Sequence, residues 1–217
     1  MQLLQNRKQQ ANADLVAFGN PEVAPKYALP GAEAEVKALA ADYPDAKVYL
    51  RNKATKKQFE ESSDQAHMIH VAAHAQADTI DPLYSRILMA SSDGKLSFLE
   101  AHEVLGLKLN GVSLVTLSAC ESGLGRVANG DEVLGFTRSF LSAGASSMVV
   151  SLWPVSDDAT KLLMSTLYGA LAHGTDLQMA MQKAQLAVLH QPGMQHPFFW
   201  APFNAIGDWR LRLEATK

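Results

Sequence analysis

The 217-residue sequence predicts an α/β fold with one mostly parallel sheet of about six strands and helices on both faces, a three-layer sandwich. Strand-like and helix-like segments alternate from end to end, which favours parallel strands joined by crossover helices. The run at 66–75 (AHMIHVAAHA) is apolar on both faces, as in a central strand of a covered sheet. No repeat, low-complexity tract or linker interrupts the alternation, so we expect one domain over 1–217, with 1–13 an N-terminal extension or a cut site from a longer chain.

The first half of the chain contains short, recognisable elements. Residues 14–23 (DLVAFGNPEV) are an apolar run stopped by Gly-Asn-Pro, which predicts a strand and a turn. Apolar positions at helical spacing and a closing proline predict a helix over 31–44. Asp93-Gly94, a strong signal for a tight β turn, predicts a hairpin. The other expected elements here are a strand at 46–52, a helix at 54–63, the hairpin at 86–98 and a helix at 99–106.

The second half repeats the alternation of strand and helix. The run GVSLVTLSA predicts another strand of the sheet, and Cys120 follows it immediately. Apolar residues trace one face of a helix in the segment that starts at Asp157. The expected elements are strands at 111–119, 146–154 and 202–211 and helices at 131–144, 157–174 and 176–190.

Composition restricts the class of protein. The chain is 47% hydrophobic and 19% charged, with a formal net charge of -3, so it has no basic excess for a nucleic-acid backbone. No apolar run approaches about 18 residues and the N-terminus lacks a signal core, so we expect a soluble, cytoplasmic protein without a membrane partner. Cys120 is the only cysteine and cannot form an internal disulfide. It is therefore either an inert core residue or a reactive thiol in a reducing compartment.

Cys120 and His74 are the candidate catalytic residues. In open α/β sheets, functional groups collect at the carboxyl ends of strands. His70 and His74 are four residues apart on an extended strand, about 13 Å, so they cannot serve one nucleophile or bind one metal ion together. His70 lies inside the apolar run, whereas His74 lies at its exit. If the two strands are parallel neighbours, His74 and Cys120 meet at one edge of the sheet.

The pair has a chemical rationale. A free thiol with a pKa of about 8.5 is mostly protonated near neutrality, and a nearby imidazole can take its proton and later return it to a leaving amine. No third polar orienting group is evident in the sequence, so a dyad is expected. Gly123, Gly125 and Gly130 follow the cysteine in a loop that suits an active-site rim. The alternatives are that the cysteine is a small core residue and that the histidine is a hydrogen-bonded core or surface residue.

Three stretches carry a family resemblance. HVAAHAQAD, then VTLSACESGLGRVANGDEVLGFTRSFLSAGASSMVVSLWPVSDDAT, then HPFFWAPFNAIGDW, together resemble the CHAT domain, a caspase-like cysteine peptidase domain of clan CD that is often joined to tetratricopeptide repeats. The resemblance covers most of the chain, from about residue 14 onward. It implies a caspase-type α/β fold and cleavage of peptide bonds through a thioester acyl-enzyme. The family's histidine and nucleophile fall on His74 and Cys120.

The resemblance also suggests further site residues. It implies that the backbone N–H groups of Ala75 and Cys120 face the developing oxyanion. Alanine replaces the family's glycine at position 75, which retains the N–H but tolerates positive φ poorly. In SLWPVSDDAT, Trp153 resembles a wall of the specificity pocket, and Asp157 is placed like an acidic residue that receives a basic side chain in separase relatives. Alternatively, Trp153 is a core residue. Asp157 is then an acidic residue in the first turn of a helix that begins after Ser156, a position that the helix dipole favours.

These observations lead to one main hypothesis and one alternative. The main hypothesis is a cysteine endopeptidase that needs no metal or organic cofactor and acts on an extended segment of a protein or peptide, with a regulatory repeat or sensor domain as the family implies. The alternative is a catalytically weak or inactive CHAT-like module that binds peptides or partner proteins. Asp131 is expected to cap the next helix, and 196–203 (HPFFWAPF) to pack in the core or close over a substrate. A nucleotide-binding fold is disfavoured because no GxGxxG follows the first strand and no GxxxxGK[ST] occurs.

Overall fold

The computed structural model describes residues 14–76, 78, 80–91, 95–118, 131–153 and 156–213, with the side chains of 131–134 excepted. Its main sheet has six strands in the order β2-β1-β3-β7-β8-β9. The first five run parallel, and β9 pairs antiparallel with β8 at the edge. The predicted α/β class and the central position of the histidine-bearing strand are confirmed. The strands are β1 (Leu15–Gly19), β2 (Lys47–Leu50), β3 (Met68–Ala72), β7 (Leu114–Leu117), β8 (Ser147–Ser151) and β9 (Phe203–Gly207).

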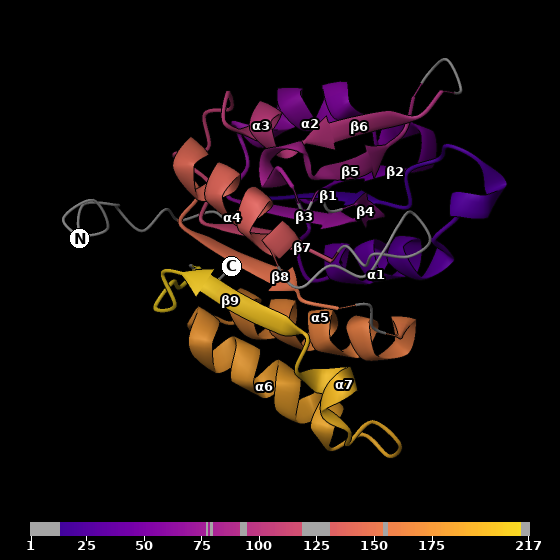
Figure 1. Cartoon of the computed structure of the whole chain (residues 1–217). Helices are drawn as coiled ribbons and strands as arrows, with labels where there is room; N and C mark the ends of the chain where they lie inside the picture. The colour runs from indigo at the N-terminus through magenta and orange to yellow at the C-terminus, as the bar shows by residue number, and fades with distance from the viewer. Residues whose placement is uncertain are drawn as a thin grey trace.

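Helices cover both faces of this sheet (Figure 1). Side chains alternate along each strand, so Leu15 and Ala17 of β1 join one buried cluster while Val16 and Phe18 join the other. The first cluster lies against α1 (Pro30–Ala40), α5 (Asp157–Ala172) and α6 (Leu177–Leu189), and the short α7 (Pro197–Trp200) packs beside α5 and α6. The second lies against α2 (Lys56–Ser63), α3 (Ala101–Val104) and α4 (Asp131–Ala143). The result is the expected three layers.

Side-chain caps explain where several helices begin. The Thr55 hydroxyl accepts a hydrogen bond from the Gln58 N–H at the start of α2. Ser156 and Asp176 accept in the same way from the third residue of α5 and of α6. Each cap satisfies one of the N–H groups that a helix leaves unpaired at its amino end. Among the described residues, no helix combines the length and the apolar character needed to span a membrane.

A second, smaller sheet lies beside the main one. It contains β4 (Ala75–Gln76), β5 (Arg86–Met89) and β6 (Ser97–Glu100), all antiparallel. The expected hairpin is therefore present, although Asp93 and Gly94 of its predicted turn lie outside the described residues. Three 3₁₀ helices were not predicted: η2 (Pro25–Tyr27), η3 (Arg51–Lys53) and η4 (Pro82–Tyr84). The second sheet starts directly after His74, so it holds the backbone on the far side of that residue.

Candidate active site

The carboxyl ends of the five parallel strands lie at one edge of the main sheet. Strands β3 and β7 are adjacent, with His70 opposite Thr116 and Val71 opposite Leu117. The N–H of Ser118 donates to the Val71 carbonyl at 2.9 Å and extends this pairing past the end of β7. His74, at the exit of β3, and Ser118, two positions before Cys120, therefore end neighbouring strands at one edge. Cys120 itself and Gly123, Gly125 and Gly130 lie outside the described residues.

His74 is buried and held from two directions. Only 6% of its surface is exposed. Its Nε2 lies 3.2 Å from the Tyr27 carbonyl oxygen, and the two rings meet edge to face at 5.9 Å between centroids. Its own carbonyl accepts from the Leu88 N–H at 2.8 Å, so the small sheet fixes its backbone. The imidazole is thus placed before any substrate arrives.

The surroundings of His74 tune its basicity. Burial lowers the pKa of the imidazole below its usual 6.5, because the charged form loses hydration, and the hydrogen bond to the Tyr27 carbonyl partly opposes this effect. When Nε2–H donates to that carbonyl, Nδ1 is the nitrogen that carries the lone pair. The sequence shows no orienting group for the histidine. The structure supplies a backbone carbonyl, which any residue type at position 27 could provide.

Ala75 adopts an extended conformation that alanine accommodates without strain. It lies in β4 opposite Ile87. The described non-glycine residues with positive φ are Asn20 and Arg51. Ala75 therefore does not adopt the positive φ that alanine tolerates poorly, and its role at the oxyanion stays a prediction.

The two predicted substrate-binding residues lie at the same edge but make different contacts. The Trp153 indole N–H donates to the Phe198 carbonyl at 3.0 Å, which ties the end of β8 to α7. Asp157 is exposed at the start of α5. Its carboxylate lies against the backbone of Gly31, where an added Cβ would be 2.2 Å from Oδ2. Asp157 is therefore close to the amino ends of both α1 and α5, a position that the helix dipole favours.

The helix α4 begins at Asp131, and the capping role predicted for this residue stays a prediction, because its side chain lies outside the described part of the chain.

A buried polar network lies behind this edge, and the sequence analysis did not identify it. Glu35 of α1 is 4% exposed and His70 of β3 is fully buried. Glu35 Oε1 is 2.9 Å from His70 Nε2, and Oε2 accepts from the Ser118 hydroxyl at 3.2 Å. On the other side of the ring, His70 Nδ1 is 3.1 Å from the Tyr168 hydroxyl, which donates to Thr116 Oγ1 at 2.9 Å. Both candidate dyad strands therefore contribute polar groups to one cluster.

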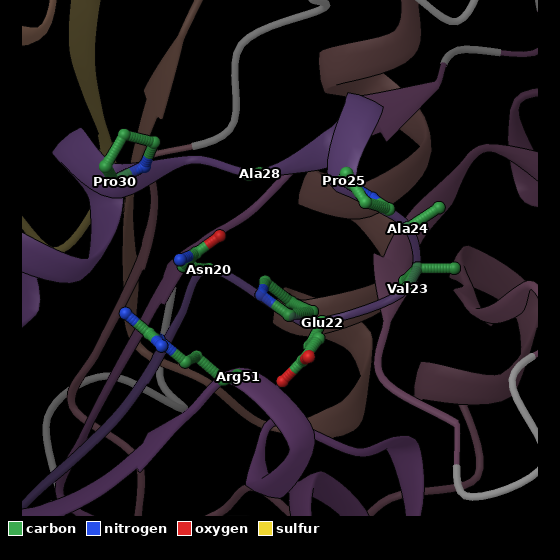
Figure 2. Close-up of a pocket in the computed structure, with 9 residues that line it drawn as sticks. Asn20, Glu22, Val23, Ala24, Pro25, Ala28, Pro30 and Arg51 are labelled. Carbon is green, nitrogen blue, oxygen red and sulfur yellow. The ribbon is translucent and has the colours of Figure 1, made fainter.

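A pocket of about 360 Å³ lies beyond the end of β1. Figure 2 shows it enclosed by the segment from Asn20 to Pro30, with Arg51 from the end of β2 alongside. Asn20 and Arg51 both adopt left-handed backbone conformations, at φ 49° and 51°. An unfavourable backbone conformation of this kind persists where contacts with the surrounding structure hold it in place. Here the Glu33 carboxylate holds both side chains, with Arg51 Nε at 2.7 Å and Asn20 Nδ2 at 3.1 Å.

The segment around this pocket also carries Tyr27, the residue that contacts His74. The Leu29 N–H donates to Asn20 Oδ1 at 2.7 Å and closes the segment on itself. Glu33, Asn20 and Arg51 therefore hold in place the segment whose carbonyl contacts His74.

Within the described ranges, no group of three or more histidine, cysteine or acidic side chains is arranged to hold a metal ion.

Comparison with known proteins gives a family and a fold. A model of the CHAT domain matches residues 1–208. Tetratricopeptide repeat protein 28 from Mus musculus is 37% identical over 110 residues, and its Homo sapiens counterpart is 38% identical over 110 residues. Each match covers 51% of this chain but 4% of the relative, so the chain corresponds to a small part of those proteins.

Solved structures agree on the architecture. The Arg-specific cysteine proteinase gingipain R superposes with a TM-score of 0.64 at 11% identity, over 93% of this chain and 48% of that one. The Saccharomyces cerevisiae separase–securin complex gives 0.61 at 12% identity, over 94% and 12%. Protein GSU0716 from Geobacter sulfurreducens gives 0.51 at 15% identity, over 94% and 99%. At these identities the likeness is one of fold.

Proposed function

Because the chain belongs to the CHAT domain family, we propose that it is a cysteine endopeptidase that cleaves a protein or peptide substrate through His74 and Cys120. One observation carries the proposal. A buried imidazole, oriented by the Tyr27 carbonyl, lies at the end of β3 beside the strand that leads to the chain's only thiol.

The proposed reaction is acyl transfer. The thiol proton of Cys120 passes to His74 Nδ1, and the sulfur attacks the substrate carbonyl carbon. The imidazolium that forms keeps its Nε2–H bond to Tyr27, which stabilises the positive charge in a site that otherwise disfavours it. The imidazolium then donates its proton to the amine as the C–N bond breaks, leaving a thioester. Water, deprotonated by the same imidazole, hydrolyses the thioester and restores the thiol.

The amides of Ala75 and Cys120 would donate to the oxyanion, and Trp153 and Asp157 would line the site for the side chain before the cut. Asp157 supports a preference for a basic residue at that position. The solved relative described as Arg-specific has the same fold, and that description motivates testing arginine first. The Asp157 carboxylate also lies close to the amino ends of α1 and α5. A basic side chain of the substrate would therefore interact with a carboxylate that already interacts with both helix ends.

The biological context is also a proposal. We propose that this catalytic unit acts under the control of a repeat or sensor region, because the curated relatives are tetratricopeptide repeat proteins. A cytoplasmic location is part of the same proposal.

The test is digestion of a diverse peptide library, read by mass spectrometry, with the native protein beside Cys120→Ala, His74→Ala and Asp157→Asn. Cleavage that both dyad variants lose, by about 10³-fold or more, supports the proposal. A selective loss of cleavage after Arg and Lys in Asp157→Asn supports the pocket assignment. A library left uncut by the folded native protein contradicts the proposal and favours the alternative of a binding module.

A further inference from the structure

We propose that Glu35 is a positioning residue that fixes the end of β7 relative to β3, through its contacts with Ser118 and His70. This inference deepens the proposed function, because these two strand ends precede the candidate nucleophile and the candidate base. Glu35 is on α1, far from both strands in sequence. Its two carboxylate oxygens are divided between them, with Oε1 beside His70 of β3 and Oε2 beside Ser118.

The burial of Glu35 is what points to a specific role. Removing a carboxylate from water costs several kcal/mol, and a buried ion pair often recovers less than well-packed apolar residues would. Glu35 Oε1 and His70 Nε2 approach to 2.9 Å, but within the described residues neither atom has an aligned hydrogen bond. The stronger geometric constraint is the hydrogen bond that Ser118 donates.

Ser118 is the place where this constraint reaches the site. Its N–H is bonded to the Val71 carbonyl of β3 and its hydroxyl to Glu35, so its backbone and side chain are fixed by different elements. It is two residues before Cys120. The regular strand β7 ends at Leu117. Within the described residues, the other hydrogen bond that links Ser118 to β3 is the one from its N–H to the Val71 carbonyl.

A matched control exists in the same network. Thr116 lies on β7 two residues earlier and accepts from Tyr168, but it is not hydrogen-bonded to Glu35. Thr116→Val keeps the side-chain volume and removes a buried hydrogen bond. It therefore mimics the loss of stability without removing the proposed link.

The experiment measures amide hydrogen exchange by NMR in the full chain for Glu35→Ala, Glu35→Gln, Ser118→Ala and Thr116→Val. Exchange at position 118 is compared with exchange at Val115, within β7, to separate local opening from global unfolding. We expect position 118 to exchange about 10-fold faster or more in Glu35→Ala and Ser118→Ala, with Val115 following only the global change. Glu35→Gln keeps an acceptor for the hydroxyl and should restore most of the protection.

A second readout connects the link to the thiol. Cys120 is the only cysteine, so its alkylation rate between pH 5 and 9 reports one site. Glu35→Ala and Ser118→Ala should each change the alkylation rate of Cys120 by about 5-fold or more at one or more pH values in this range, whereas Thr116→Val should not. Because both changes remove the same contact, the double variant should show about the same effect as either single variant. If Glu35→Ala does not fold, Ser118→Ala carries the test.

The outcomes separate the two proposals. Uniform acceleration of all amides, with an unchanged alkylation profile, overturns the positioning role and leaves the endopeptidase proposal standing. Local acceleration at position 118 in Glu35→Ala and Ser118→Ala, together with a native protein that cleaves no peptide, supports the positioning role and counts against the endopeptidase.

Discussion

Replacing Glu33 by glutamine should remove stability in a way that depends on pH. Glu33 is almost buried, and its carboxylate accepts from Lys37 and Arg51, each at 2.7 Å, and from Asn20 at 3.1 Å. The hydrogen bonds from Arg51, then Lys37, then Asn20 lower its pKa from 4.5 to about 2. Protonation of Glu33 in the folded protein therefore weakens these three hydrogen bonds. The unfolded chain lacks them, so protonation lowers the free energy of unfolding.

The magnitude follows from linkage between protonation and folding. A fall in pKa from 4.5 to about 2 corresponds to an upper limit of about 3.4 kcal/mol. The Lys37 and Arg51 side chains are 59% and 62% exposed, and exposed ion pairs are worth about 0–1 kcal/mol each. We therefore expect Glu33→Gln to lower the free energy of unfolding by about 1–2 kcal/mol at pH 7. The pKa is depressed, so this contribution is complete above 4.5 and disappears as the pH falls toward 2.

The assay is urea denaturation of the native protein and Glu33→Gln between pH 3 and 7. Glu61→Gln makes the same chemical change in an exposed pair with Lys57, where N and O are 3.7 Å apart, and should cost less than about 0.5 kcal/mol. A difference between native and Glu33→Gln that stays constant over this pH range, or that is no larger than the Glu61→Gln effect at pH 7, would refute the reasoning.

Three further changes test other parts of the structure. Burial lowers the pKa of His74, so its NMR titration midpoint should fall below 6.5 and the protein should lose stability as the pH drops below that value; a midpoint above 6.5 would contradict the burial argument. Gly135→Ala would place a Cβ 2.0 Å from the Pro82 carbonyl oxygen and should lower the free energy of unfolding by about 1–3 kcal/mol, despite the higher helix propensity of alanine. The Tm should fall accordingly, and an unchanged or higher Tm would mean that α4 can shift without cost. Thr55→Ala removes the cap of α2 and should cost about 1 kcal/mol in denaturant unfolding, with Thr55→Ser retaining most of the stability.

Most of the main sheet could be predicted from hydrophobic patterns. The run 66–75 is apolar on both faces, and β3 is an interior strand with five buried residues. The alternation that separates Leu15 from Val16 in the two buried clusters is a property of any extended strand. The antiparallel direction of β9 was not predicted, because periodicity reports which residues are buried and not the direction in which a strand runs.

The candidate site was only partly predictable. His74 could be found because it lies at the exit of an apolar strand, where functional groups collect in open α/β sheets. The Tyr27 carbonyl could not, because any residue type supplies one. Glu35 did leave a signal. Ala32, Glu35, Val36 and Leu39 have the spacing of one helical face, so a carboxylate lies among the residues that face the core. An acidic residue in that stripe needs a buried partner, and His70 is that partner.

The adjacency of β3 and β7 also determines when the candidate site can assemble during synthesis of the chain. His74 leaves the ribosome before Ser118, with β5, β6 and α3 made in between. Parallel strands pair only once the crossover that joins them is complete, and pairings of high sequence separation form slowly. A nascent chain that ends within α3 has the imidazole and the neighbouring strand β1, but not β7, the strand that leads to Cys120. A peptidase built on this topology would therefore be unable to cut its own emerging chain until the strand that leads to the thiol has joined the sheet.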